Sequence, residues 1–184
     1  VDQLQKGATT LTEAWDANPA SSQNHCMLGH AEEWFYTGLA GINPDPAAPG
    51  FKKFVIRPQP VGDVTSVKAS YDSMHGRIAS EWTRNDGTFT LDVTIPANTT
   101  ATVFVPATDE AKVTESARPI PAAQGVRFLR LEDNRLVLAV DSGRYRFVSP
   151  WKNPVRAGAR RGNSGGGNGR RRDLGNRTRP RRER

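Results

Sequence analysis

The spacing of apolar residues changes along the chain, and each spacing predicts one kind of element. Between residues 27 and 39 apolar residues recur every three or four positions, as on one face of a helix: Met27, Leu28, Ala31, Trp34, Phe35 and Leu39. We expect Ser22 or Asn24 to cap the start of this helix, and Gly38 and Gly41 lie where it should end. The pattern therefore predicts one amphipathic helix near the N-terminus.

Beyond residue 50 the pattern becomes typical of strands, because residues 51–56 form a short apolar run and the apolar positions that follow alternate with polar ones. We expect strands at 51–56, 67–71, 78–82, 89–95, 101–105, 129–131, 136–140 and 145–147. Turn signals separate several of them, including Asn85-Asp86-Gly87 and Asp133-Asn134. Seven or eight short strands at this spacing, with no helices between them, predict an antiparallel β-sandwich and argue against a parallel α/β sheet.

Composition divides the chain into four parts. Residues 43–50 contain three prolines and cannot form a helix or a central strand, so we interpret them as a linker. They separate the helical part, residues 1–42, from the sandwich, residues 51–150. From Val155 the chain is mostly Gly, Arg and Asn, which cannot bury enough surface to offset an ordering entropy of about 1–2 kcal/mol per residue. We expect residues 151–184 to be a disordered basic tail.

The net charge of +7 comes from this tail. Residues 155–184 hold 11 Arg and two acidic residues, whereas the rest of the chain has 15 basic and 17 acidic residues. A flexible Arg-rich segment binds phosphate without sequence specificity, but no aromatic residue after Trp151 could stack on bases. A GC-rich reading frame after a frameshift or a missed stop explains the tail better, and a nucleic-acid binder remains the less favoured alternative.

Several other functions are excluded. Cys26 is the only cysteine, so the chain has no internal disulfide, and three scattered histidines do not complete a tetrahedral zinc site. We expect no metal and no cofactor. No apolar run reaches 18 residues, which argues against a membrane span. Residue 1 is Val with no leader sequence behind it, so we expect the chain to begin within a longer protein.

The richest candidate chemistry lies between residues 7 and 19. Glu13 and Asp16 flank Trp15 in a loop of small and hydroxylated residues. Sugar-cleaving sites combine such groups, because an aromatic ring packs against the sugar and a carboxylate activates water or protonates the leaving oxygen. Composition alone still favours a solvated loop.

The sandwich offers weaker candidates. His75 lies in a predicted turn and is interpreted as a solvated residue. Tyr71 and Trp82 could stack on a sugar, although core packing is the favoured interpretation. His30, Glu32 and Glu33 lie on the predicted helix, where solvated or packing roles are favoured over catalysis.

Longer motifs point to a family. The helical part contains Gly7-Ala8-Thr9-Thr10, then Leu11-Thr12-Glu13-Ala14-Trp15-Asp16, and later Asn24-His25 and Glu33-Trp34-Phe35-Tyr36. The sandwich contains Gly50-Phe51-Lys52-Lys53-Phe54-Val55-Ile56 and Ile95-Pro96-Ala97-Asn98-Thr99-Thr100-Ala101. Over residues 7–148 the chain closely resembles the end of the catalytic barrel and the C-terminal β-sandwich of bacterial α-L-rhamnosidases, glycoside hydrolase family 78.

The resemblance implies an α/α-toroid enzyme that removes terminal α-L-rhamnose with inversion, using two acidic residues. Glu13 corresponds to the glutamate that we take as the general base, and the general acid is expected upstream, outside this chain. Trp15 and His25 correspond to residues of the sugar pocket. Many members carry Trp where this chain has Thr12, which leaves the aglycone open. The implied partners are a rhamnosylated small molecule or polysaccharide and the rest of the barrel.

A helix from a closed toroid loses its neighbours when the rest of the ring is absent. Exposing Trp34, Phe35 and Leu39 would forgo roughly 1.5–3 kcal/mol each. We therefore expect residues 1–42 to be poorly held or folded back on the sandwich, and the isolated chain to be inactive. The sandwich is expected to brace the last barrel helix, and a carbohydrate-binding module is the rival interpretation.

Overall fold

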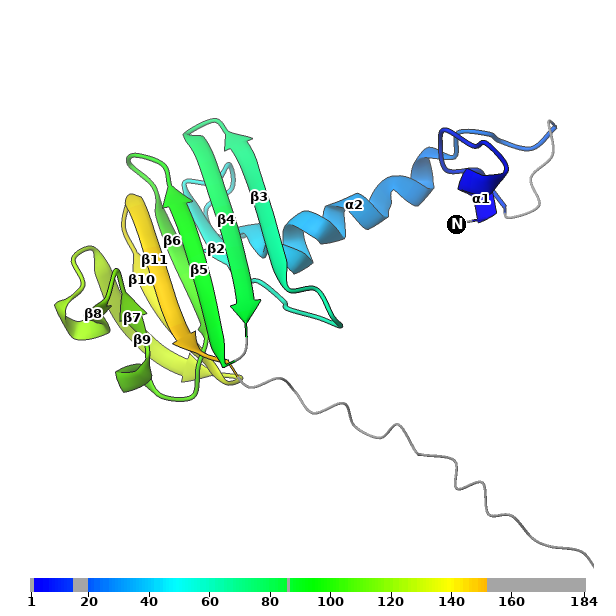
Figure 1. Cartoon of the computed structure of the whole chain (residues 1–184). Coiled ribbons are helices and arrows are strands. Elements are labelled where there is room, and N and C mark those ends of the chain that lie inside the picture. The colour runs from blue at the N-terminus through cyan, green and yellow to red at the C-terminus, as the bar shows by residue number, and fades with distance from the viewer. Residues whose placement is uncertain (1, 15–19, 86, 152–184) are drawn as a thin grey trace, which may run out of the picture. The chain divides into compact units, whose positions relative to one another are not determined.

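The computed structural model describes residues 2–14, 20–85 and 87–151, and within them the chain is mainly β. The helical elements are short: α1 (Asp2–Gln5), the 3₁₀ turn η1 (Cys26–Gly29), α2 (His30–Trp34) and the π-helical η2 (Phe35–Leu39). The last three are continuous and form the predicted helix (Figure 1). The predicted disordered tail from residue 152 and the candidate residue Trp15 lie outside the described residues.

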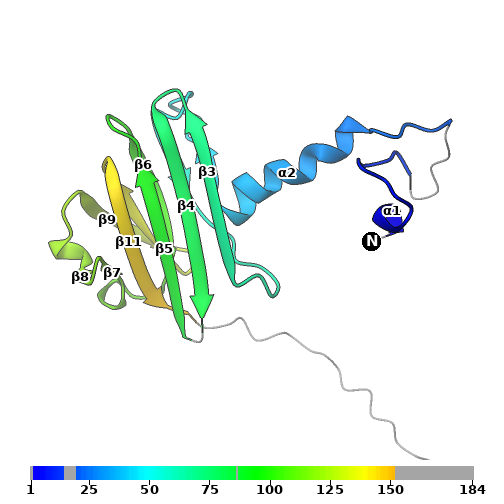
Figure 2. The ribbon, with the colours of Figure 1, turned by 45° about the horizontal axis from the view of Figure 1, so that its top comes forward.

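Two sheets form the rest of the fold and face one another (Figures 1 and 2). The five-stranded sheet has the order β1 (Ile42–Pro44), β2 (Lys53–Ile56), β6 (Thr100–Pro106), β10 (Arg135–Val140) and β9 (Val126–Glu132). The six-stranded sheet has the order β3 (Ser66–Ser73), β4 (Gly76–Asn85), β5 (Thr88–Ile95), β11 (Gly143–Pro150), β7 (Thr114–Glu115) and β8 (Arg118–Pro119). Two 3₁₀ turns, η3 (Glu110–Lys112) and η4 (Ile120–Ala122), flank β7 and β8.

The core lies between the sheets, where alternate residues of each strand point inward. Its largest fully buried side chains include Phe54 on β2, Trp82 on β4, Phe89 on β5 and Phe147 on β11. Trp82 stacks on Phe89 with ring centroids 5.8 Å apart. All paired strands are antiparallel except β2 and β6, which run parallel. The predicted β-sandwich is therefore confirmed, and the β2–β6 pair is a parallel exception among strands that we predicted to be antiparallel.

Three details differ from the sequence-based predictions. Asn43 and Pro44, which we assigned to a linker, belong to edge strand β1, where a proline costs no ladder hydrogen bond. The residue that precedes the helix as its N-cap is His25, and neither Ser22 nor Asn24 takes that place. Tyr71, for which we favoured core packing, is 43% exposed because it lies on the edge strand β3. Its ring packs there against Phe51 at a centroid distance of 4.8 Å.

Candidate active-site loop

The loop with the candidate residues is formed by two segments that are hydrogen-bonded to each other. The amide of Glu13 donates to the Ser22 carbonyl at 3.0 Å, and the amide of His25 donates to the Leu11 carbonyl at 2.8 Å. The Thr10 hydroxyl donates to the Gln23 carbonyl across the same pair. The fold therefore brings Glu13 and His25, twelve positions apart in sequence, onto adjacent segments of one loop.

Glu13 presents its carboxylate to solvent. Its Oε2 accepts a hydrogen bond from the Ser22 amide at 3.2 Å, and the described residues provide no donor to its Oε1. One oxygen is thus oriented by the backbone while the other can accept a proton from water. Sequence reasoning considered Ser22 only as a helix cap and missed this contact, because its signal is a backbone amide that any residue carries.

His25 is half-buried and immediately precedes the helix. Its backbone is extended, with φ −92° and ψ 91°, so the chain turns at this residue from the loop into the first helical turn. The His25 backbone therefore marks the start of the helix. Trp15 and Asp16, the other polar and aromatic candidates of this loop, lie outside the described residues.

Thr12 is a buried polar residue that stabilises the loop by hydrogen bonds. It is 7% exposed, accepts a hydrogen bond from Gln3 Nε2 of α1, and donates its hydroxyl to the Ala14 carbonyl at 2.9 Å. The Thr12 side chain therefore links α1 to the residue after Glu13.

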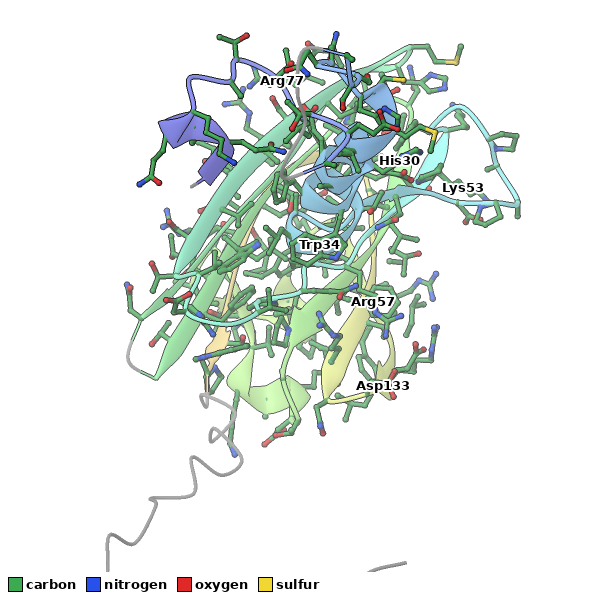
Figure 3. All side chains as sticks on the ribbon, turned by 90° about the vertical axis from the view of Figure 1, so that its right-hand side faces the viewer. His30, Trp34, Lys53, Arg57, Arg77 and Asp133 are labelled. Atoms are coloured by element: carbon green, nitrogen blue, oxygen red, sulfur yellow. The ribbon has the colours of Figure 1, made fainter. Side chains whose placement is uncertain are left out.

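The apolar face of the helix is uncovered. The exposed fractions are 65% for Met27, 44% for Trp34 and 52% for Phe35. Trp34 lines a pocket together with Val55 and Arg57 beside the five-stranded sheet. Trp34 and Arg57 are both labelled in Figure 3. An amphipathic helix normally packs its apolar face against another part of the protein, so we expect a neighbour to cover this face.

The polar residues of the helix take structural or solvated positions. His30 Nδ1 donates to the Met27 carbonyl at 2.6 Å, and Glu32 and Glu33 are exposed. His75 lies in the β3–β4 turn, where its amide donates to the Ser73 hydroxyl at 3.1 Å. The placements of His30, Glu32 and Glu33 agree with the interpretations made from the sequence, whereas His75, interpreted as solvated, is half-buried in its turn.

Trp82 is 1% exposed, as the core interpretation predicted, and cannot serve as a sugar platform. In the parts of the chain that the structure describes, no three His, Cys, Asp or Glu side chains converge on a metal site. None of the described helices is both long and apolar enough to cross a membrane.

Two groups with shifted pKa values belong to the sandwich. Burial, with Arg57 nearby, lowers the pKa of Arg135 on β10, and burial together with Asp141 and Glu115 raises the pKa of Tyr145 on β11. Arg135 donates to the Pro58 carbonyl at 2.7 Å, which identifies it as a structural contact of the β2–β3 connection.

Comparison with known proteins identifies both parts of the chain. Residues 2–39 match the six-hairpin glycosidase domain of bacterial alpha-L-rhamnosidases, and residues 41–118 match the bacterial alpha-L-rhamnosidase C-terminal domain. The chain belongs to the bacterial α-L-rhamnosidase family. The two rhamnosidase domains meet between residues 39 and 41, where the helix ends and β1 begins.

Individual rhamnosidases agree with this assignment. An alpha-L-rhamnosidase from Streptomyces avermitilis is 37% identical over 154 residues, which cover 79% of this chain and 14% of that protein. The crystal structure of Streptomyces avermitilis alpha-L-rhamnosidase complexed with L-rhamnose has a TM-score of 0.67 at 36% identity, over 79% of this chain and 14% of that one. The alpha-L-rhamnosidase from Dictyoglumus thermophilum has a TM-score of 0.69 at 30% identity, over 81% and 17%. The chain thus spans a small C-terminal share of the rhamnosidases it matches.

Proposed function

We propose that this chain contributes the general base and part of the sugar pocket to an inverting α-L-rhamnosidase, and that Glu13 is the base. The observation that carries the proposal is the paired loop, in which an exposed, backbone-oriented carboxylate lies on a segment bonded to the one that ends at His25. The loop also lies within the residues that match the glycosidase domain.

The chemistry requires two carboxyl groups. The Glu13 carboxylate removes a proton from water, whose oxygen attacks the anomeric carbon, while a carboxylic acid protonates the leaving glycosidic oxygen on the opposite side of the ring. In inverting enzymes the two groups stand about 6.5–9.5 Å apart so that the water fits between base and sugar. We assign the acid to the part of the catalytic domain that this chain does not cover.

His25 and Trp15 complete the proposed pocket. A neutral imidazole can both donate to and accept from sugar hydroxyls, and an indole packs against the apolar face of the ring. The substrate class is a terminal α-L-rhamnoside on a small molecule or polysaccharide, in line with the relative crystallised with L-rhamnose.

The rest of the catalytic domain is the proposed partner of the uncovered helix. Met27, Leu28, Trp34 and Phe35 are each at least 44% exposed here, although they form one apolar stripe. Neighbouring helices of the toroid would bury this stripe, at a gain of roughly 25 cal/mol per Å² of apolar surface.

The test uses a full-length rhamnosidase that carries this sequence and an aryl α-L-rhamnoside. Glu13→Gln should lower kcat by at least about 10³-fold while circular dichroism and Tm stay close to the parent, because the amide cannot take the proton. Glu33→Gln is the matched control, since Glu33 is an exposed carboxylate on the adjacent helix and should leave kcat within about twofold.

Azide distinguishes a base from a structural carboxylate. Glu13→Ala should regain turnover in azide and form the β-rhamnosyl azide, because azide attacks the anomeric carbon without giving up a proton. Unchanged activity in Glu13→Gln, or an azide product of retained configuration, would contradict the assignment of Glu13 as the base of an inverting enzyme.

A further inference from the structure

Five consecutive carbonyl oxygens at the end of the helix accept hydrogen bonds from the sandwich. Asn43 Nδ2 donates to Thr37 at 2.9 Å, and the Gln59 amide donates to Gly38 at 3.0 Å. The next three carbonyls belong to Leu39, Ala40 and Gly41, and their donors are Trp82 Nε1 at 2.7 Å, Ser80 Oγ at 2.7 Å and the Arg57 amide at 2.8 Å. We call these five hydrogen bonds the carbonyl cap.

The carbonyl cap replaces the usual ending of a helix. The last carbonyls of a helix have no intrahelical partner and are normally satisfied by water or by a local turn. Here Ala40 and Ser80 are both fully buried, so water cannot substitute for Ser80 Oγ at the Ala40 carbonyl. The donors come from β1, the β2–β3 connection and β4, and they converge only when the sandwich is folded.

The backbone around the cap is also closely packed, within the helix at Gly38 and against the sandwich at Gly41. A Cβ on Gly38 would lie 2.5 Å from Trp34 Nε1, and a Cβ on Gly41 would lie 2.2 Å from the Arg57 carbonyl carbon. Within this turn the Ala40 amide donates to Phe35, five residues back, which is the wide π-helical spacing. The backbone is therefore fixed by close contact as well as by hydrogen bonds.

We propose that Ser80 and Trp82 are positioning residues for rhamnoside hydrolysis, although they lie in the sandwich. The helix that they hold at its last turn begins directly after His25, next to the segment bonded to Glu13. This inference rests on the proposed function, because it takes the loop to be the catalytic one.

Geometry sets the size of the effect. Residues 26–39 form a rod of about 20 Å at 1.5 Å per residue, so a tilt of only ~3° at the cap moves the loop end by about 1 Å. A displacement of that size in a catalytic site can lower the rate by up to about 10²-fold. A sandwich residue far from the sugar can thereby control kcat.

The first test needs no activity and uses this chain. In Ser80→Ala, amide hydrogen exchange should accelerate at least about fivefold over residues 26–41 relative to the parent, and remain unchanged in β5 and β11. Ser80→Thr, which keeps the hydroxyl, should restore the slow exchange. Val103→Ala is the matched control, because Val103 is fully buried in β6 without being a donor of the carbonyl cap. Equal exchange over residues 26–41 in Ser80→Ala and the parent would overturn the proposal.

The second test measures kcat and KM in a full-length rhamnosidase, well below the Tm of every variant. Ser80→Ala and Trp82→Phe should lower kcat about tenfold or more, while Val103→Ala lowers Tm and leaves kcat within about twofold. A kcat for Ser80→Ala equal to that of Val103→Ala would refute the positioning role. If instead Glu13→Gln stays active, the proposed function fails, and the exchange experiment still decides whether the cap holds the helix.

Discussion

Gly41 is the residue at which the two domains join, and its backbone permits no side chain. Its φ is +76°, and a Cβ there would lie 2.2 Å from both the Arg57 carbonyl carbon and the Pro58 nitrogen. Left-handed backbone costs a non-glycine residue roughly 1–2 kcal/mol, and forcing an atom into a packed site adds roughly 1–3 kcal/mol. The close approach is what lets the Arg57 amide reach the Gly41 carbonyl at 2.8 Å.

We therefore expect Gly41→Ala to lower the free energy of unfolding of this chain by roughly 2–5 kcal/mol. Gly29→Ala is the matched control: no atom lies within 4 Å of its Cβ position, and its φ is −67°. That substitution should raise stability by roughly 0.5–1 kcal/mol, as alanine does in helices. Urea unfolding followed by tryptophan fluorescence measures both, and similar stabilities for the two variants would contradict this account of Gly41.

At the scale of elements, short apolar runs and hydrophobic alternation together predict every strand of four or more residues. The eight predicted segments correspond to β2, β3, β4, β5, β6, β9, β10 and β11. β7 and β8 have two residues each, and no period can be read from two positions. β4 alternates poorly because Ser80 points inward among apolar residues, where its hydroxyl satisfies the Ala40 carbonyl.

The candidate site was only partly accessible from sequence. Glu13, Trp15 and His25 were found through motif resemblance, but the pairing that joins Glu13 to Ser22 is made by backbone groups. The carbonyl cap was hidden for the same reason, since its acceptors are all main-chain oxygens and its donors are spread from Asn43 to Trp82. Side-chain patterns report which residues are buried, not which carbonyls they will meet.

The exposed face of the helix also yields a prediction about the proposed toroid. Phe35 is 52% exposed, so Phe35→Ala in this chain should cost about 1 kcal/mol or less, whereas Phe54→Ala, at a core position 1% exposed, should cost roughly 3–5 kcal/mol. In a full-length rhamnosidase, packing by the toroid should raise the cost of Phe35→Ala toward that of Phe54→Ala. Denaturant unfolding of both variants in both proteins gives the comparison, and an equally small cost in the full-length protein would show that the toroid leaves Phe35 uncovered.

At the scale of the whole molecule, the loop and helix depend on the sandwich more than the sandwich depends on them. The sandwich core is formed by both sheets and includes Ala40 from the end of the helix, but none of the described residues of the loop. The loop and helix gain their fixed end from the sandwich, through the carbonyl cap, and have an apolar face that the sandwich leaves uncovered. We therefore expect the C-terminal domain to act as a scaffold that holds the last helix of the glycosidase domain in a fixed orientation.

This dependence predicts what the 184-residue chain does alone. Hydrolysis with inversion needs an acid and a base on opposite sides of the sugar, and a base without its acid gains little, because the leaving oxygen must depart unprotonated. We expect the purified chain to hydrolyse an aryl α-L-rhamnoside no faster than its own Glu13→Gln variant, although its circular dichroism shows a folded β-sandwich. Turnover by the parent chain that disappears in Glu13→Gln would place both carboxyl groups within these residues, and the acid would then have to be sought among the loop and helix carboxylates, beginning with Asp16.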